Sequence, residues 1–349
     1  MVRAERTDVA DPGRRRRDRP SLLSVAGLLW LGRSRIFRAI FLVTVLVLLG
    51  VTLAQRGPGL WHQIGNLSVP VMALAFLATL GGLMCSLMVW RSLLADLGSR
   101  LSLTEAIRVM FIGQLSKYVP GSVWPLLAQA ELAADRGVPR TRTAVSVLLS
   151  SAVMVWTGGL VAAVSLPFAS TTSTGDYLWI MFAAPVTLVL LWPPVLNWSL
   201  RLLLRLLRRP SLYQPVTLRG LAVSTGWAML GWTANGLMVY VLTTRLAGTD
   251  ARQVLAVSIA GYALSWVAGF LFIIAPAGAG VREAILIAVV NVQTTGTVAI
   301  TVALVSRGLA VVADAVAGAA AAALVGGRRL RALRSAARSP ELLGPDAIE

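Results

Sequence analysis

The stretch Gly113-Gln114-Leu115-Ser116-Lys117-Tyr118-Val119-Pro120-Gly121-Ser122-Val123-Trp124 interrupts apolar helical segments with a charge, several polar side chains and a Pro-Gly break. Pro120 cannot donate to a helix ladder, and it moves the residue before it out of the helical region. Gly121 then lets the chain reverse direction without a Cβ penalty. Lys117 is the only lysine in the sequence. The sequence therefore places a compact, flexible ammonium group beside a break in a helix.

A second broken stretch, Ala275-Pro276-Ala277-Gly278-Ala279-Gly280-Val281-Arg282-Glu283, again joins proline and glycine to charge. We expect Pro276, Gly278 and Gly280 to interrupt the helix here, as Pro120 and Gly121 do in the first stretch. In a membrane protein, two such interruptions in the two halves of the chain point to a transport site.

Composition predicts a membrane protein with an all-α fold. Of the 349 residues 56% are hydrophobic and 13% are charged, whereas a soluble chain carries about 25% charge. Several apolar runs approach the roughly 20 residues that cross a bilayer, so we expect a polytopic transmembrane helix bundle of about seven or eight spans. The net charge of +17 comes from arginines that flank these runs, which argues against nucleic acid. This pattern predicts the plasma membrane, with both termini in the cytoplasm.

The chain divides into three predicted regions. Residues 1–36 form a basic, disordered cytoplasmic tail, part of which can lie on the membrane surface as an interfacial helix. Residues 37–327 form the transmembrane domain, which ends at Gly326-Gly327, and residues 328–349 form a basic cytoplasmic tail. The expected full spans are 37–54, 71–90, 143–166, 177–198, 218–244 and 297–325.

The two broken stretches predict re-entrant hairpins. Residues 101–118 and 122–136 are each too short or too polar to cross the membrane, so we expect a hairpin that enters from the cytoplasmic side. Residues 253–293 allow two interpretations. They form either a full span with a short return span, favoured by their lengths, or a second hairpin from outside, favoured by symmetry. The second interpretation gives an internal inverted repeat.

Ionisable side chains at membrane depth normally face a cavity or a partner. The candidates are Lys117, Glu131, Arg282, Glu283, Arg307 and Asp314. Arg282 opens a helix after Ala279-Gly280, where free N–H groups and a bidentate guanidinium would suit a phosphate. The alternative is that these groups pair among themselves and only hold helices together. We expect neither a metal nor a cofactor, because the sequence has no cluster of metal ligands and no ATP-type phosphate loop.

The residues from Gln114 to Trp124 and from Pro276 to Glu283 resemble the transmembrane flippase-like domain of lysylphosphatidylglycerol synthases and its stand-alone relatives. The resemblance covers roughly residues 37–327. It implies that the protein moves a lipid, or a lipid-linked headgroup, between leaflets. The positions that match the family pattern are Lys117, Pro120, Gly121, Gly278, Gly280, Arg282 and Glu283. The chain leaves no room for the aminoacyl-transferase domain, so we expect no aminoacyl-lipid synthesis and no catalytic residues.

The leading hypothesis is a flippase-like protein whose two breaks line a polar cavity for a lipid headgroup. Lys117 and Arg282 would hold the phosphate, together with the polar residues Gln114, Ser116 and Tyr118. Glu283, Glu131, Arg307 and Asp314 would serve as charge partners. The ligand would be an anionic or aminoacylated phospholipid, or a polyprenyl-linked lipid. Alternatives are a glycosyltransferase that uses a polyprenyl-phosphate donor and a non-catalytic scaffold for a membrane enzyme.

Overall fold

The computed structural model describes residues 57–118, 124–169, 189, 192–206, 214–248, 251–272 and 276–338. Within these ranges every regular element is a helix, which confirms the all-α prediction. The predicted span at residues 37–54, most of the span at 177–198, and Pro120 and Gly121 lie outside the described residues.

Among the described residues, four helices are long and apolar enough to cross a membrane. They are α3 (Val69–Asp96), α7 (Arg140–Ala169), α11 (Ala251–Leu271) and α13 (Gly296–Arg338). Helix α10 (Leu218–Ala247) covers another predicted span, but its Ser, Thr, Trp and Asn residues lower its mean hydropathy. The total number of spans stays a prediction.

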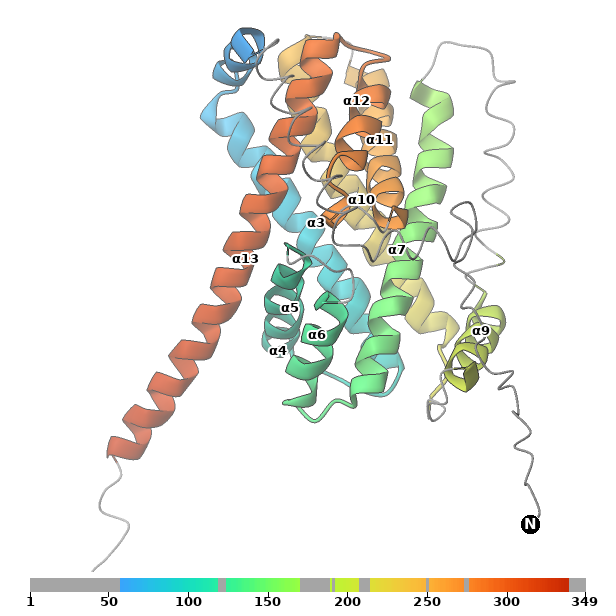
Figure 1. Ribbon diagram of the computed structural model, residues 1–349, viewed down its shortest axis with the longest axis vertical. Coiled ribbons are helices and arrows are strands. Elements are labelled where there is room, and N and C mark those ends of the chain that lie inside the picture. Colours follow the sequence, from blue (N-terminus) through green and yellow to red (C-terminus); the bar gives the residue numbers. More distant parts are fainter. Residues whose placement is uncertain are drawn as a thin grey trace, which may run out of the picture.

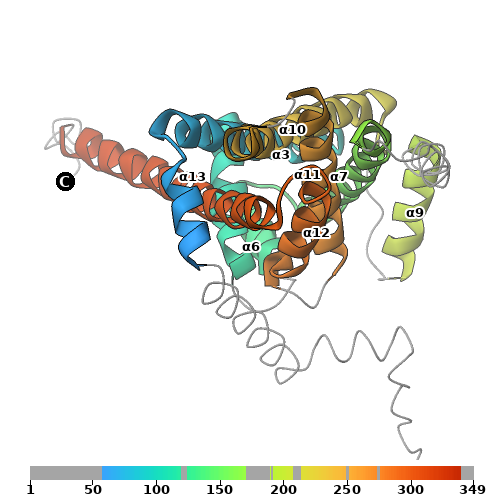
Figure 2. The same cartoon turned by 90° about the horizontal axis from the view of Figure 1, so that it is seen from above.

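These helices form an upright bundle. Helices α3 and α10 lie side by side along one edge, and α11, α12 and α6 lie on the other side (Figure 2). Asn235 of α10 is buried against Gly82 of α3, where a Cβ would overlap the amide, so the two backbones approach closely. Trp232 of α10 is also buried, and its indole nitrogen donates to the hydroxyl of Thr157 in α7 at 3.0 Å. Close backbone contact and buried hydrogen bonds of this kind hold helices together in lipid.

The first broken region is a short helical run on the lower half of the bundle (Figure 1). It consists of α4 (Leu103–Ile107), a π-helical turn (Arg108–Ile112), α5 (Gly113–Leu115) and a 3₁₀ turn (Ser116–Tyr118). After residues outside the description, α6 (Trp124–Ala134) runs beside it. A residue inserted into an α-helix produces a π turn, and such turns often occur at functional sites.

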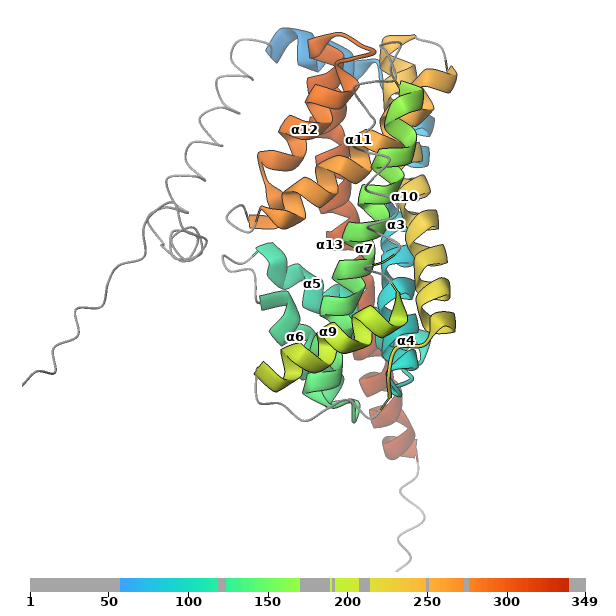
Figure 3. The same ribbon diagram turned by 90° about the vertical axis from the view of Figure 1, so that its right-hand side faces the viewer.

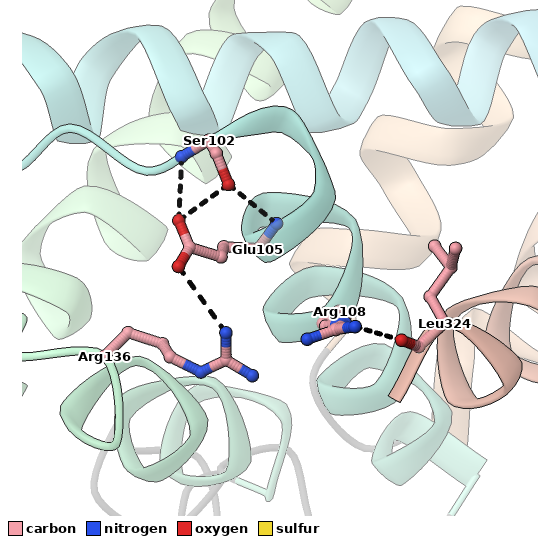
Figure 4. Close-up of polar contacts among 5 residues, drawn as sticks. All are labelled: Ser102, Glu105, Arg108, Arg136 and Leu324. Atoms are coloured by element: carbon pink, nitrogen blue, oxygen red, sulfur yellow. Dashed lines mark hydrogen bonds and ion pairs between the residues drawn. The ribbon is translucent and has the colours of Figure 1, made fainter. Parts of the chain in front are cut away.

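Ser102 begins this run with a capping box (Figure 4). The Ser102 hydroxyl accepts from the Glu105 N–H at 3.4 Å, and the Glu105 carboxylate accepts from the Ser102 N–H at 3.0 Å. The same carboxylate pairs with Arg136 at 3.5 Å. Arg108, in the next turn, donates to the Leu324 carbonyl of α13. These contacts fix the start of the first broken region against α13 and against the end of α6.

The second broken region is formed by α11, a 3₁₀ turn (Pro276–Gly278) and α12 (Val281–Val290). The break is sharp because three residues have positive φ: Ala277 at 51°, Gly278 at 70° and Gly280 at 83°. In Figure 3, α11 and α12 occupy the upper half of the bundle and α5 and α6 occupy the lower half, and the Ser116–Tyr118 turn contacts the Pro276–Gly278 turn. Whether residues 253–293 form a span with a short return or a second hairpin stays a prediction.

The last span, predicted to end before Gly326-Gly327, belongs to a helix that continues beyond these glycines, because α13 runs to Arg338. A glycine inside a helix costs only about 1 kcal/mol relative to alanine. The surrounding alanine, leucine and arginine residues are good helix formers and outweigh that cost. The apolar part that could cross a membrane nevertheless ends at Leu324.

Helix α9 (Pro193–Leu206) lies crosswise to the upright helices near the lower end (Figure 3). Its buried face, with Leu196 and Leu204, packs on the bundle core. Arg201 is exposed and its Nε donates to the Asn197 carbonyl of the same helix at 3.2 Å. The exposed apolar residues of the helix are Trp198, Leu202 and Leu206. A helix with this division of faces suits the boundary between lipid and water.

Candidate functional site

The Ser116–Tyr118 turn and the second break meet at a cluster of charged residues. Lys117, at the end of the first broken region, places its Nζ 2.7 Å from Oδ2 of Asp314 in α13. The hydroxyl of Tyr118 donates to the same oxygen at 2.6 Å. The Asp314 side chain is only 8% exposed, against 30% for Lys117. One carboxylate of α13 therefore holds both residues at the end of the first broken region.

Arg307, two turns earlier in α13, holds the second break. Its Nε lies 3.3 Å from Oε1 of Glu283, and an Nη donates to the carbonyl of Ala277 at 3.2 Å. The other oxygen of Glu283 accepts from the N–H of Gly280 at 2.6 Å. The sequence predicts that a phosphate would use the N–H groups at this helix start, but Glu283 itself already takes the one at Gly280.

Arg282 differs from these residues because no described carboxylate forms an ion pair with it. Its guanidinium lies over the ring of Trp266 in α11, 5.3 Å from the ring centre. Its Nε is buried and has no hydrogen-bond acceptor. The side chain is also confined, because a Cβ on Gly269 or on Gly278 would lie 2.9 Å from that Nε. The fold therefore holds one unpaired cation against two glycine backbones and an indole ring.

The cluster borders a small cleft that is bounded by α11, α12 and α13. The polar and aromatic residues that line it are Tyr262, Ser265, Trp266, Arg282, Glu283, Ser306 and Arg307. Arg307 lies about 16 Å along α13 from Gly296, at about 1.5 Å per residue. If α13 crosses a bilayer whose core is about 30 Å thick, this cleft opens near its middle.

The structure brings together five of the six ionisable residues predicted at membrane depth. The sixth, Glu131, is exposed on α6 and forms a two-point ion pair with Arg140, at 2.9 and 2.7 Å. Ser116 donates to the Gly113 carbonyl of its own helix at 2.6 Å, and Gln114 is partly buried in α5. Pro276, Gly278 and Gly280 form the second break as predicted, whereas Pro120 and Gly121 lie outside the described residues.

Sequence reasoning missed the residues of α11 that shape the surroundings of Arg282. Trp266 stacks on Phe270 with ring centres 5.2 Å apart and meets Trp232 edge-on at 5.4 Å. Gly269 lies one helical turn after Trp266 and leaves room for the arginine. An aromatic residue and a glycine at this spacing are common in apolar helices, so the sequence carries no signal that could have singled them out.

No curated protein matches the chain. The family model described as "Lysylphosphatidylglycerol synthase TM region" matches residues 36–318, which include both breaks and every residue of the charged cluster. This match agrees with the resemblance carried by the two broken stretches. The chain is an integral membrane protein that belongs to the family of the lysylphosphatidylglycerol synthase TM region.

Proposed function

We propose that this protein moves a lipid between the leaflets of the membrane by accepting its headgroup in the cleft beside Arg282, while the acyl chains stay in lipid. The observation that carries the proposal is the unpaired guanidinium of Arg282, held beside the second break between Gly269, Gly278 and Trp266. An arginine at membrane depth is costly and normally serves a substrate path or meets a partner. A bound headgroup phosphate would supply that partner.

The contacts suggest different roles for the two basic residues that the sequence points to. A guanidinium can bind a phosphate with two parallel hydrogen bonds, so Arg282 is the primary contact. Lys117 is already paired with Asp314, so it can meet the phosphate only when that pair opens. The hydroxyls of Tyr262, Ser265 and Ser306 line the same cleft and can donate to further headgroup oxygens. The proposed role is transport, without a chemical step.

The test is lipid movement in liposomes that contain the purified protein. Headgroup-labelled phospholipids and polyprenyl-phosphate lipids are placed in one leaflet, and their appearance in the other leaflet is followed over time. We expect Arg282→Gln to reduce the rate at least about tenfold, because a hydrogen-bonded charge contributes about 1.5–3 kcal/mol.

The matched control is Arg201→Gln, which removes the same charge from the exposed surface of α9. It should leave the rate within about twofold of the wild-type rate. Equal rates for Arg282→Gln and wild-type protein, with both inserted normally, would refute the role of Arg282. Movement of no lipid at all would refute the transport proposal.

A further inference from the structure

We propose that Lys117 releases and regains one proton in each transport cycle, so that a proton gradient across the membrane can drive the movement of lipid. This inference rests on the proposed function and assigns its energy source. Lys117 is the only lysine of the sequence, and every other cationic side chain apart from His62 is an arginine. A guanidinium keeps its charge in proteins, whereas a desolvated lysine ammonium can become a neutral amine. Lys117 is therefore the one cation of the charged cluster whose charge can change.

Lys117 lies where the two broken regions touch. Its turn (Ser116–Tyr118) contacts the Pro276–Gly278 turn, and its Nζ lies 2.7 Å from Oδ2 of Asp314 in α13. The Lys117 side chain is 30% exposed and that of Asp314 only 8%, so the ammonium is the partner that water reaches. Ionisable residues at membrane depth are the groups from which transporters build proton paths.

The charge on Lys117 decides how firmly the first broken region is attached to α13. The contact of the ammonium with Asp314 is a charge-assisted hydrogen bond, about twice as strong as a neutral one. Loss of the proton leaves an amine, whose hydrogen bond to the carboxylate is weaker. The hydroxyl of Tyr118 donates to the same Oδ2 at 2.6 Å, so the nearly buried carboxylate keeps a donor. Proton release therefore loosens the attachment without leaving Asp314 unpaired.

The neighbouring charges make the protonation of Lys117 depend on its contact with Asp314. Asp314 favours the ammonium, whereas the positive charges of Arg282 and Arg307 oppose it. Partial burial opposes it as well, because desolvation disfavours a charged form. When the first broken region moves away from Asp314, the balance shifts towards the neutral amine. The ionisable groups around the pair are Tyr118 of the same turn, Tyr262 of α11, Arg282 and Glu283 of α12, and Arg307 of α13.

Water closes the proton balance of the cycle. While the site is open to one side of the membrane, an N–H bond of the Lys117 ammonium breaks and water on that side takes the proton. After the site has turned to the other side, the amine takes a proton from the water there. One proton thus crosses the membrane in each cycle, and no other reactant is consumed.

The first measurement detects the protonation of Lys117 directly. Because the chain has one lysine, protein made with lysine isotopically labelled at Cε gives a single side-chain NMR signal, whose shift differs between ammonium and amine. Asp314→Asn removes the anion and keeps the shape of its side chain. We expect this variant to reach the amine signal at least about one pH unit below the wild-type protein. The same titration in both proteins would overturn the inference, whether or not any lipid moves.

The second measurement is lipid movement under a pH difference. The liposomes and labelled lipids of the transport assay are used with different pH inside and outside, while potassium and its ionophore hold the membrane potential at zero. If one proton moves with each lipid, the ratio of labelled lipid in the two leaflets should shift by up to about tenfold per pH unit. The shift should reverse with the gradient and vanish when a protonophore is added.

Lys117→Arg tests whether this response belongs to Lys117. The variant keeps a cation opposite Asp314 but cannot release its proton, so its lipid ratio should not follow the pH difference. Arg201→Lys on the exposed surface of α9 is the matched control, because it exchanges the same two side chains in the opposite direction. It should respond as the wild-type protein does. A wild-type response in Lys117→Arg would overturn the assignment.

Two outcomes separate this inference from the proposed function. Lipid movement by the wild-type protein that ignores the pH difference would overturn proton coupling and leave transport standing. Absence of lipid movement under every condition would refute transport, and the NMR titration would still decide whether Lys117 loses its proton when Asp314 is neutralised.

Discussion

The Nζ of Lys117 lies 2.7 Å from Oδ2 of Asp314, an oxygen that also accepts the hydrogen bond of Tyr118. This contact fastens the end of the first broken region to the middle of α13. The pair lies where the second break also touches α13, through Arg307 and the Ala277 carbonyl. The two broken regions are thus joined to one helix by ionic contacts less than three turns apart, from Arg307 to Asp314.

The Lys117–Asp314 pair predicts strong coupling in stability. Lys117→Met leaves a nearly buried carboxylate without its cation, and Asp314→Leu leaves the ammonium unpaired, so each variant should lower the free energy of unfolding. The double variant removes both charges and should lose about 1–3 kcal/mol less than the sum of the two single variants. Denaturant unfolding in detergent measures this difference. Additive losses would show that the pair contributes no coupling.

Ala277 is a position where replacement by glycine should stabilise the folded protein. Its φ of 51° is unfavourable for a residue with a Cβ, by about 1–2 kcal/mol relative to glycine. Ala277→Gly should therefore raise the free energy of unfolding by about 1 kcal/mol. The control is Ala288→Gly, at an exposed helical position of α12, which should lower it by about the same amount. Thermal unfolding in detergent measures both, and a loss at both positions would contradict the strain at Ala277.

Gly269 predicts a loss of binding without a loss of charge. A Cβ at this position would overlap the Arg282 side chain, so Gly269→Ala should displace the guanidinium from Trp266. We expect the amount of phospholipid bound to the purified protein in detergent, measured by native mass spectrometry, to fall about tenfold. This loss should occur although alanine favours a helix over glycine by about 1 kcal/mol. Gly226→Ala in α10 has no atom within 4 Å of the new Cβ and serves as the control. Normal lipid retention by Gly269→Ala would show that the confinement of Arg282 is not needed.

The capping box at Ser102 predicts a pH dependence. Hydrogen bonds from Ser102 lower the pKa of the Glu105 carboxyl, and Arg136 lowers it further. A carboxyl whose pKa is lower in the folded protein stabilises it at neutral pH, and this contribution is lost as the pH falls through the lowered pKa. Ser102→Ala should cost about 1 kcal/mol at neutral pH. Unfolding followed across the acidic range should show the difference between the two proteins shrink as Glu105 is protonated, and a constant difference would exclude the linkage to Glu105.

Much of the fold was readable from the sequence because local signals and tertiary packing agree. The break at Pro276–Gly280 lies where the sequence predicts it. The π turn at Arg108–Ile112 and the continuation of α13 past Gly326 were not predicted. No local sequence pattern marks the position of a π turn, and helix continuation through two glycines depends on a balance of small helix propensities. Local patterns do not fix either feature.

The candidate site was predicted in its residue types and only partly in its pairing. Lys117, Arg282, Glu283, Arg307 and Asp314 were singled out because charge at membrane depth is costly. Arg307 and Asp314 lie on one face of α13, but each pairs with a residue of a different broken region. Which residues pair over such distances in the sequence depends on how the two broken regions are oriented in the fold, and local sequence does not determine that orientation. Glu131 looks equally deep in the sequence but is exposed beside Arg140, because α6 ends near the lower surface.

Helix α13 contacts the second break at Arg307, the first broken region at Asp314 and again at Gly318, which packs against Leu115, and the start of that region at Leu324. Both broken regions are therefore attached to the same helix. If α13 slides or rotates, both broken regions move with it. Neither region can move relative to α13 unless its own ion pair with that helix opens. In a transport cycle, opening of the site towards one leaflet and its closing towards the other would then be coupled through a single movement of α13.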